Sequence, residues 1–171
     1  MKTLLVIDMV NDFCKEDGTL YVGDQVKECI SEAKELIADF REAEDGIIYL
    51  CDAHGKDDPE FESWPPHCII GSHGECVVDE LEPTDNDMVM GKQTFSGVFD
   101  NRELLEILDQ EDNEVIVCGV CTSICVMETV SDLSKNGIKC TVIEKACCDL
   151  DKTSHDMAIN RMKILFGSEI K

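Results

Sequence analysis

Short apolar runs alternate with amphipathic segments along the whole chain. The apolar runs predict strands at residues 3–7, 47–51, 88–90, 115–118 and 139–143, with a short last strand at 168–170. Apolar residues at helical spacing predict helices at residues 25–42, 101–109, 123–135 and 153–165. The strand segments show little alternation of apolar and polar residues, which is typical of strands covered on both faces. The pattern therefore predicts an α/β fold with a parallel sheet between helices.

End signals accompany two of the predicted helices. Asp100 stands where it can cap the helix 101–109, and Thr122 or Ser123 can cap the helix that carries Cys125. Asn136 and Gly137 follow the last apolar position of that same helix, as residues that end helices do. These signals predict where the segment around Cys125 begins and ends.

Composition narrows the class of protein. The 171 residues are most simply one domain, 1–171, and 37 acidic against 15 basic residues give a net charge of −22. Such a charge disfavours nucleic acid and anionic membrane surfaces as partners. No signal peptide is evident, and no apolar run approaches the roughly 20 residues that span a membrane. We therefore expect a cytoplasmic protein.

Eleven cysteines could indicate a disulfide framework, but such frameworks belong mainly to short secreted chains. Several of the cysteines occupy apolar patterns as small hydrophobic residues, namely Cys29, Cys51, Cys118 and Cys140. Reduced thiols are the expected state.

Chemically capable residues stand at the predicted strand ends. In an open parallel sheet the ligand crevice lies beyond the carboxyl ends of the strands. Asp8 follows the first strand, Lys92 the third, and Cys125 lies in the first turn of the helix after the fourth. A helix start favours a thiolate, a carboxylate can take the thiol proton, and a lysine can offset the negative charge. Together they predict a nucleophilic site. Taken singly, Asp8 could cap a turn, Lys92 could be an exposed lysine and Cys125 a buried structural cysteine.

A second group of polar residues follows the second strand. Asp52 and His54 stand at the strand end, and the irregular segment 52–87 can return Glu60 and His67 to the same place. Mixed oxygen and nitrogen ligands suit one divalent ion, with zinc first and manganese or iron next. The alternative is a polar surface loop. His73 is a rival ligand that we interpret as a loop residue, and His155 as a structural one.

Cys118, Cys121 and Cys125 permit a competing interpretation as ligands of a metal ion or an iron–sulfur cluster. No fourth ligand is evident nearby, and Cys118 belongs to a predicted buried strand. It remains a minor alternative.

The order of these motifs resembles that of the isochorismatase-like cysteine hydrolases, and within them the nicotinamidases (pyrazinamidases). The resemblance rests on LLVIDMVNDF with Asp8, CDAH with Asp52 and His54, WPPHC with His67, GKQTFSG with Lys92 and GVCTSICV with Cys125. It covers nearly the whole chain. It implies a doubly wound, Rossmann-like three-layer fold around six mostly parallel strands.

The resemblance also implies a mechanism. Cys125 would attack a carboxamide carbon and form a thioester, Asp8 would accept and return its proton, and Lys92 would hold both in charged forms. The backbone N–H groups of Cys121 and Cys125 would bind the oxyanion, with a cis peptide between Val120 and Cys121.

The resemblance further implies a metal ion on Asp52, His54 and His67, with Glu60 as a less certain ligand. Phe13 and Trp64 would be aromatic walls of the substrate pocket, and the assembly would be a homo-oligomer. Two positions depart from the family pattern. Ser123 stands where an acidic residue is common, and Val98 where an aromatic is common.

Three functional hypotheses follow. The main one is an amidohydrolase that converts nicotinamide to nicotinate and ammonia in NAD salvage. The second is a related cysteine hydrolase for another small-molecule amide, with no need for the metal. The third, from a different class, is a noncatalytic metal-binding or redox-sensing protein.

Overall fold

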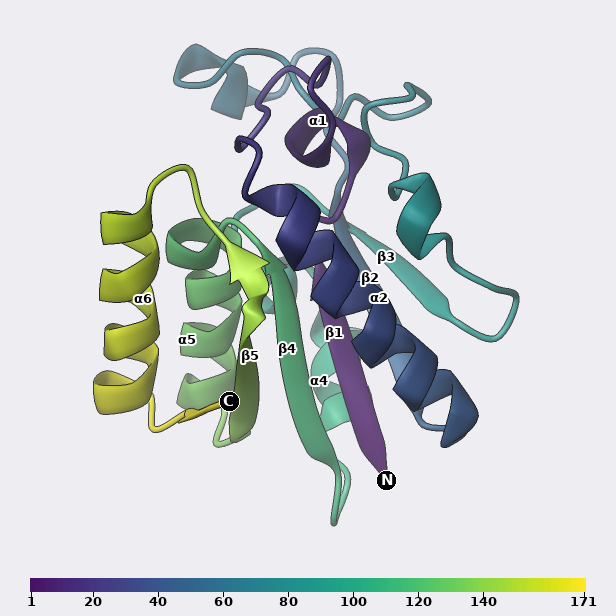
Figure 1. The fold of residues 1–171 in the computed structure, drawn as a ribbon, viewed down its shortest axis with the longest axis vertical. Helices are drawn as coiled ribbons and strands as arrows, with labels where there is room; N and C mark the ends of the chain where they lie inside the picture. Colours follow the sequence, from purple (N-terminus) through teal and green to yellow (C-terminus); the bar gives the residue numbers. More distant parts are fainter.

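The computed structural model describes residues 1–171 and contains one six-stranded sheet (Figure 1). Its strands are β1 (Lys2–Ile7), β2 (Gly46–Asp52), β3 (Met88–Lys92), β4 (Glu114–Val120), β5 (Cys140–Cys148) and β6 (Glu169–Ile170). They lie in the order β3-β2-β1-β4-β5-β6, and every neighbouring pair is parallel. The predicted parallel sheet is therefore confirmed.

Helices cover the sheet on both sides. The longer ones are α2 (Val26–Glu42), α4 (Arg102–Leu108), α5 (Met127–Lys135) and α6 (Lys152–Leu165). In Figure 1, α2 crosses in front of the sheet and α4 lies behind it. Helix α5 packs against β5, and α6 packs against α5. The predicted α/β class with helices flanking the sheet is confirmed.

The core is continuous and lies along the central strands. A cluster of 43 buried hydrophobic residues includes most of β1 and β4, which explains why these segments are apolar without alternation. One exception is Gly119 in β4, whose φ is +130° and where a Cβ atom would lie 2.0 Å from the Ile7 carbonyl oxygen. Only glycine allows β4 to approach β1 this closely just before the Cys121–Cys125 turn.

Loops and short helices gather at the carboxyl ends of the strands, at the top of Figure 1. They include α1 (Asn11–Cys14) and α3 (Gly97–Asp100), and the short 3-10 helices η1 (Pro59–Glu62) and η2 (Asp79–Leu81). The fourth strand leads into η3 (Thr122–Val126), one π-helical turn that continues into α5. The first part of the irregular segment 52–87 therefore lies over the edge where a parallel sheet binds ligands, and its end returns to the opposite edge, where Asp87 pairs with Arg41.

The predicted end of the fifth strand at residue 143 is wrong, because β5 runs on to Cys148. The register to β4 shifts between Val117 and Gly119, which pair with Val142 and Cys147. This irregularity accommodates the polar residues Glu144 and Lys145, which interrupt the apolar pattern and hid the rest of the strand. As a result, Asp149 follows the true strand end.

Two of the predicted caps are also wrong. Asp100 is the last residue of α3, and its carboxylate accepts hydrogen bonds from the N–H groups of Gln93 and Thr94. Neither Thr122 nor Ser123 caps η3, which starts after Cys121 without a side-chain cap. The end of α5 is as predicted, with Asn136 as its C-cap and Gly137 at a φ of +81°.

No helix in the structure combines the length and apolar character needed to cross a membrane. All eleven cysteines are unpaired, as the composition predicted.

Candidate active site and metal-binding cluster

Asp8, Lys92 and Cys125 converge at the carboxyl edge of the sheet. Asp8 follows β1, Lys92 ends β3 and Cys125 lies in η3, and all three are buried. Lys92 Nζ lies 2.8 Å from Asp8 Oδ2. The sulfur of Cys125 and carboxylate oxygens of Asp8 and Asp52 lie within 4.8 Å of one another. A thiol, an acid and an ammonium group therefore share one buried site.

Asp52, the last residue of β2, joins this group to its surroundings. Its backbone N–H donates to Asp8 Oδ1 at 2.8 Å, and its Oδ1 accepts a hydrogen bond from Lys92 Nζ. Lys92 also donates to the Thr94 carbonyl at 3.2 Å. The lysine thus occupies the space between two carboxylates, and this leaves no place for a metal ion among Asp8, Asp52 and Cys125.

Burial and mutual charge set the protonation of these groups. Burial, with the Asp52 charge, raises the pKa of Asp8 to about 6, although Lys92 opposes the shift. Burial alone would lower the pKa of Lys92, but Asp8 and the other acidic groups outweigh it and raise that pKa well above its usual value. Burial likewise acts to raise the pKa of Asp52, but the Lys92 charge and hydrogen bonds to His54, His67 and Lys92 together outweigh it, and the pKa lies below its usual value. Asp8 is thus poised to exchange a proton near neutral pH.

The predicted resting thiolate at Cys125 is wrong. Burial, together with the charges of Asp8 and Asp52 and a hydrogen bond to Asp8, raises the pKa of Cys125 well above its usual value despite Lys92. The helix start was expected to favour the anion, but burial and the two carboxylates favour the neutral thiol. Cys125 therefore rests as a thiol whose sulfur lies within 4.8 Å of the carboxylate that can take its proton.

Asp52, His54 and His67 form a second cluster with ligand atoms turned toward one another. Asp52 Oδ2 lies 3.6 Å from His54 Nε2 and 3.7 Å from His67 Nε2. Glu60 Oε1 lies 3.8 Å from His67 Nε2, but it falls outside the closest group of three. The structure therefore brings together three of the four predicted ligands and leaves Glu60 beside them.

The donor set of this cluster fits a divalent metal ion. His54 Nε2 is buried without a hydrogen-bond partner, while His54 Nδ1 lies 3.1 Å from Asp58 Oδ2. His67 Nδ1 donates to the Pro65 carbonyl at 2.8 Å, so its Nε2 also faces the cluster. An outer partner on each Nδ1 is the usual way in which metal-binding histidines are oriented.

Asp58 was not predicted from the sequence. It precedes Pro59 and accepts a hydrogen bond from the Glu60 N–H at the start of η1. An aspartate before a proline is a helix-start signal, and it could have indicated this residue. Burial disfavours a charged His54, but Asp52 and Asp58 raise its pKa to about 9, so a metal ion must displace a proton there.

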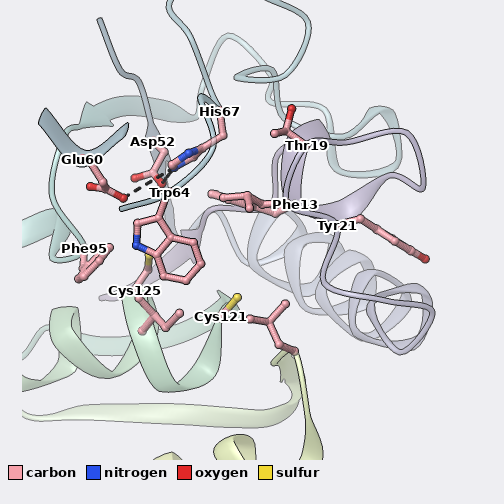
Figure 2. Close-up of a pocket in the computed structure, with 13 residues that line it drawn as sticks. Phe13, Thr19, Tyr21, Asp52, Glu60, Trp64, His67, Phe95, Cys121 and Cys125 are labelled. Carbon is pink, nitrogen blue, oxygen red and sulfur yellow. Dashed lines mark ion pairs between the residues drawn. The ribbon is translucent and has the colours of Figure 1, made fainter. Parts of the chain in front are cut away.

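A pocket of about 240 Å³ opens onto both clusters (Figure 2). Asp52, His67 and Cys125 line it, and so do the predicted wall residues Phe13 and Trp64. In the view of Figure 2 the Trp64 ring lies between Cys125 and the group formed by Asp52, Glu60 and His67. The other lining residues are Thr19, Leu20, Tyr21, Glu60, Phe95, Cys121, Ile124 and Leu150. Most of these stand on loops whose sequence has no periodicity to indicate their place.

The peptide bond between Val120 and Cys121 is cis, as the resemblance implied. The Cys121 N–H has no hydrogen-bond acceptor within the protein, and Cys121 lines the pocket beside Cys125. An unpaired backbone donor at a ligand pocket is available to bind an oxyanion.

The remaining candidates lie elsewhere. Cys118 is buried in β4 and, like Cys121, belongs to neither cluster of closely spaced ligand atoms. His73 contacts Asn11, and His155 Nδ1 lies 2.8 Å from Thr122 Oγ1, in agreement with loop and structural interpretations. Val98 is buried in α3 and does not line the pocket.

Comparison with known proteins identifies the family of this chain. The sequence model of the isochorismatase domain matches residues 2–170. The chain belongs to the isochorismatase family. Solved proteins of this family have the fold that the sequence predicted, since they superpose on this chain with TM-scores of about 0.9.

Several isochorismatase-family relatives act on amides. The nicotinamidase/pyrazinamidase of Mycobacterium tuberculosis is 28% identical over 177 residues, 95% of each chain. The pyrazinamidase of Pyrococcus horikoshii, solved in complex with zinc, is 27% identical with a TM-score of 0.89 and covers 99% and 98% of the two chains. The N-carbamoylsarcosine amidase of Thermoplasma acidophilum is 28% identical with a TM-score of 0.86, over 99% and 95%. The chain is therefore a hydrolase of a family that includes nicotinamidases and other amidases.

Proposed function

We propose that this protein is a nicotinamidase, which hydrolyses nicotinamide to nicotinate and ammonia and so contributes to NAD salvage. The observation that carries the proposal is that one small pocket touches both the Cys125 sulfur and the Asp52 and His67 side chains. Its aromatic walls, Phe13 and Trp64, suit a flat ring. A reactive thiol alone would serve any amide, whereas a metal cluster beside it suits an amide whose ring carries a nitrogen.

Asp8 and Cys125 act first. As the sulfur attacks the carboxamide carbon, its proton passes to Asp8, whose pKa of about 6 makes it a base at neutral pH. Lys92, 2.8 Å from Asp8 Oδ2, stays charged and offsets the anions that form. The tetrahedral intermediate then expels ammonia, which takes its proton from Asp8, and leaves an acyl thioester on Cys125. Water hydrolyses the thioester, releasing the carboxylic acid and restoring the thiol.

Backbone groups meet the developing oxyanion. The unpaired N–H of Cys121 and the N–H of Cys125 are the donors that we assign to this role. The thiol of Cys121 takes no part, because it belongs to no group of closely spaced ligand atoms that includes Asp8, the base that takes the proton of Cys125.

Asp52, His54 and His67 would hold one divalent ion, with zinc as our first choice. Two imidazole nitrogens and a carboxylate oxygen are a donor set of catalytic zinc sites, which keep an open position. When bound, the ion supplies a Lewis acid for a nitrogen atom of the substrate ring. Glu60 is close enough to His67 to act as a further ligand or as a partner of a bound water.

Ammonia release from nicotinamide, pyrazinamide and benzamide tests the proposal. Benzamide has the shape of nicotinamide without the ring nitrogen, so it is the matched control. We expect turnover of nicotinamide and pyrazinamide, at least tenfold lower kcat/KM for benzamide, and loss of the difference after chelation. Benzamide turnover equal to that of nicotinamide would contradict the role of the metal cluster.

A second candidate is hydrolysis of another small amide. It is supported by the apolar residues at the pocket, such as Leu20 and Leu150, and by the likeness to an N-carbamoylsarcosine amidase. Aliphatic amides hydrolysed at full rate in the presence of chelator would favour it. An inactive chain whose Cys125 does not react with alkylating reagents would instead favour a noncatalytic metal-binding or redox-sensing protein.

A further inference from the structure

The helix that carries Cys125 begins without any cap from its own segment. Cys121 precedes η3 and makes no side-chain cap hydrogen bond. Thr122, the first residue of η3, directs its hydroxyl to His155 Nδ1 at 2.8 Å. The first N–H groups of a helix have no partner within it, so they need an acceptor from elsewhere.

Asp149 supplies that acceptor from the end of β5. Its Oδ2 accepts a hydrogen bond from the Ser123 N–H at 2.5 Å, across 26 residues of sequence, and its Oδ1 accepts one from the Leu150 N–H at 2.8 Å. Asp149 is only 3% exposed. A buried carboxylate with two N–H donors is held in one geometry, because losing either bond would leave a buried charge partly unpaired.

The backbone of Asp149 is fixed as well. The preceding residue, Cys148, pairs with Val120 in the sheet, and the Asp149 carbonyl accepts a hydrogen bond from Gln25 Nε2 at 2.7 Å. Asp149 is therefore a rigid point at the carboxyl edge of the sheet, next to the strand that leads into the Cys121–Cys125 turn.

Ser123 lies midway between Cys121, whose backbone N–H we assign to the oxyanion, and Cys125, whose side chain is the proposed nucleophile. It follows Cys121 by two residues and precedes Cys125 by two. A hydrogen bond at Ser123 thus restrains the segment that sets the distance from the Cys121 N–H to the Cys125 sulfur. A shift of about 1 Å in such a segment can cost on the order of 100-fold in rate.

We propose that Asp149 is a positioning residue for amide hydrolysis, which holds the Cys121–Cys125 turn so that the nucleophile and the oxyanion donors face the same point. The inference rests on the proposed amidase function. In this role Asp149 does not contact the substrate, and it acts only through its hydrogen bond to the Ser123 N–H.

Asp149→Asn tests this role. Asparagine has the size of aspartate but one carbonyl oxygen, so it cannot accept from both N–H groups. We expect kcat for nicotinamide to fall roughly 10- to 100-fold, with KM within twofold, because the loss falls on the transition state. Alkylation of Cys125 by iodoacetamide develops no oxyanion, so its rate in the variant should stay within threefold of the wild-type rate. Mass spectrometry of the peptide that contains Cys125 measures this rate.

Asp87→Asn is the matched control. The Asp87 side chain is 4% exposed and also accepts from a backbone N–H, that of Thr84, but it pairs with Arg41 far from the pocket. The Asp87→Asn variant should have a lower melting temperature than the wild type, with kcat and KM unchanged. If Asp149→Asn does not fold, Asp149→Ser decides, since the serine oxygen takes the place of the aspartate Cγ, one bond short of Oδ2, and so does not reach the Ser123 N–H. The same loss of kcat is expected.

The outcomes separate the two proposals. Wild-type protein that hydrolyses no amide contradicts the proposed function itself. Active wild type with an equally active Asp149→Asn variant overturns the positioning role alone. A parallel loss of kcat, Cys125 alkylation and melting temperature also overturns it, because general destabilisation would then explain the effect.

Discussion

Asp52 and Lys92 pair through only one of the two aspartate oxygens. Oδ1 accepts the hydrogen bond from Lys92, while Oδ2 faces His54 and His67 at 3.6 and 3.7 Å. One carboxylate therefore belongs to both clusters, and it couples the ammonium that supports the nucleophile to the group that we assign to metal binding.

Asp52→Asn and His54→Ala should consequently differ. Both should reduce the zinc content of the purified protein to below one half per chain. Asp52→Asn should also lower stability by more than His54→Ala does, with a cost of about 3 kcal/mol, because it leaves buried Lys92 with one carboxylate partner fewer. Urea denaturation of metal-free samples measures this directly, and equal midpoints for the two variants would contradict the shared role of Asp52.

Cys125→Ala should abolish turnover while preserving the fold. Loss of a covalent nucleophile removes several orders of magnitude in kcat. Cys121→Ala is the control, since the proposed donor there is the backbone N–H, which alanine keeps, and kcat should stay within about threefold. Ammonia release and circular dichroism check both variants. Substantial residual activity in Cys125→Ala would rule out the thioester.

The pH dependence should follow Asp8. Burial and Asp52 raise its pKa to about 6, and the protonated carboxyl cannot accept the thiol proton. Below pH 6, kcat/KM should therefore fall about tenfold per pH unit, and it should level off above pH 7. Asp8→Asn should lose roughly 1,000-fold at neutral pH. A flat profile from pH 5 to pH 7 would assign the proton to another group.

Gly119→Ala should be far more costly than Gly137→Ala, although both glycines have a positive φ, +130° and +81°. At Gly119 a Cβ atom would lie 2.0 Å from the Ile7 carbonyl oxygen, whereas at Gly137 nothing lies within 4 Å. We expect about 1 kcal/mol for Gly137→Ala from backbone conformation alone, and more than 3 kcal/mol for Gly119→Ala. Chemical denaturation measures both, and similar costs would show that β1 and β4 can separate.

Periodicity predicted much of the fold because it is a local property. The apolar runs identified all six strands, and β1 and β4 were located to within two residues at either end. The prediction failed for β5, where Glu144 and Lys145 interrupt the apolar run and a register shift against β4 lets the strand continue. It also missed α1 and α3, which are four residues long and too short to show a helical period.

In the candidate site, too, local sequence patterns indicated some features, and only the tertiary structure determined the others. Asp8, Asp52, Lys92 and Cys125 were found because a strand end can be read from the residues before it. The neutral thiol of Cys125 could not be foreseen, since its pKa depends on burial and on two carboxylates from other strands. The partner of His54, Asp58, was hidden in a loop.

The sequence by itself determined the types of element, the parallel character of the sheet and the residues that stand at its carboxyl edge, because periodicity and strand ends are encoded by neighbouring residues. Only the tertiary structure decided which of those residues meet. The order of the strands brings the ends of β1, β2 and β3 side by side, so that the Lys92 ammonium group contacts both Asp8 and Asp52. The extension of β5 places Asp149 on the Ser123 N–H. These contacts join segments that are 26 to 84 residues apart in the sequence. Each contact is caused by the packing and the charges of side chains buried at the carboxyl edge of the sheet, which no local sequence pattern encodes.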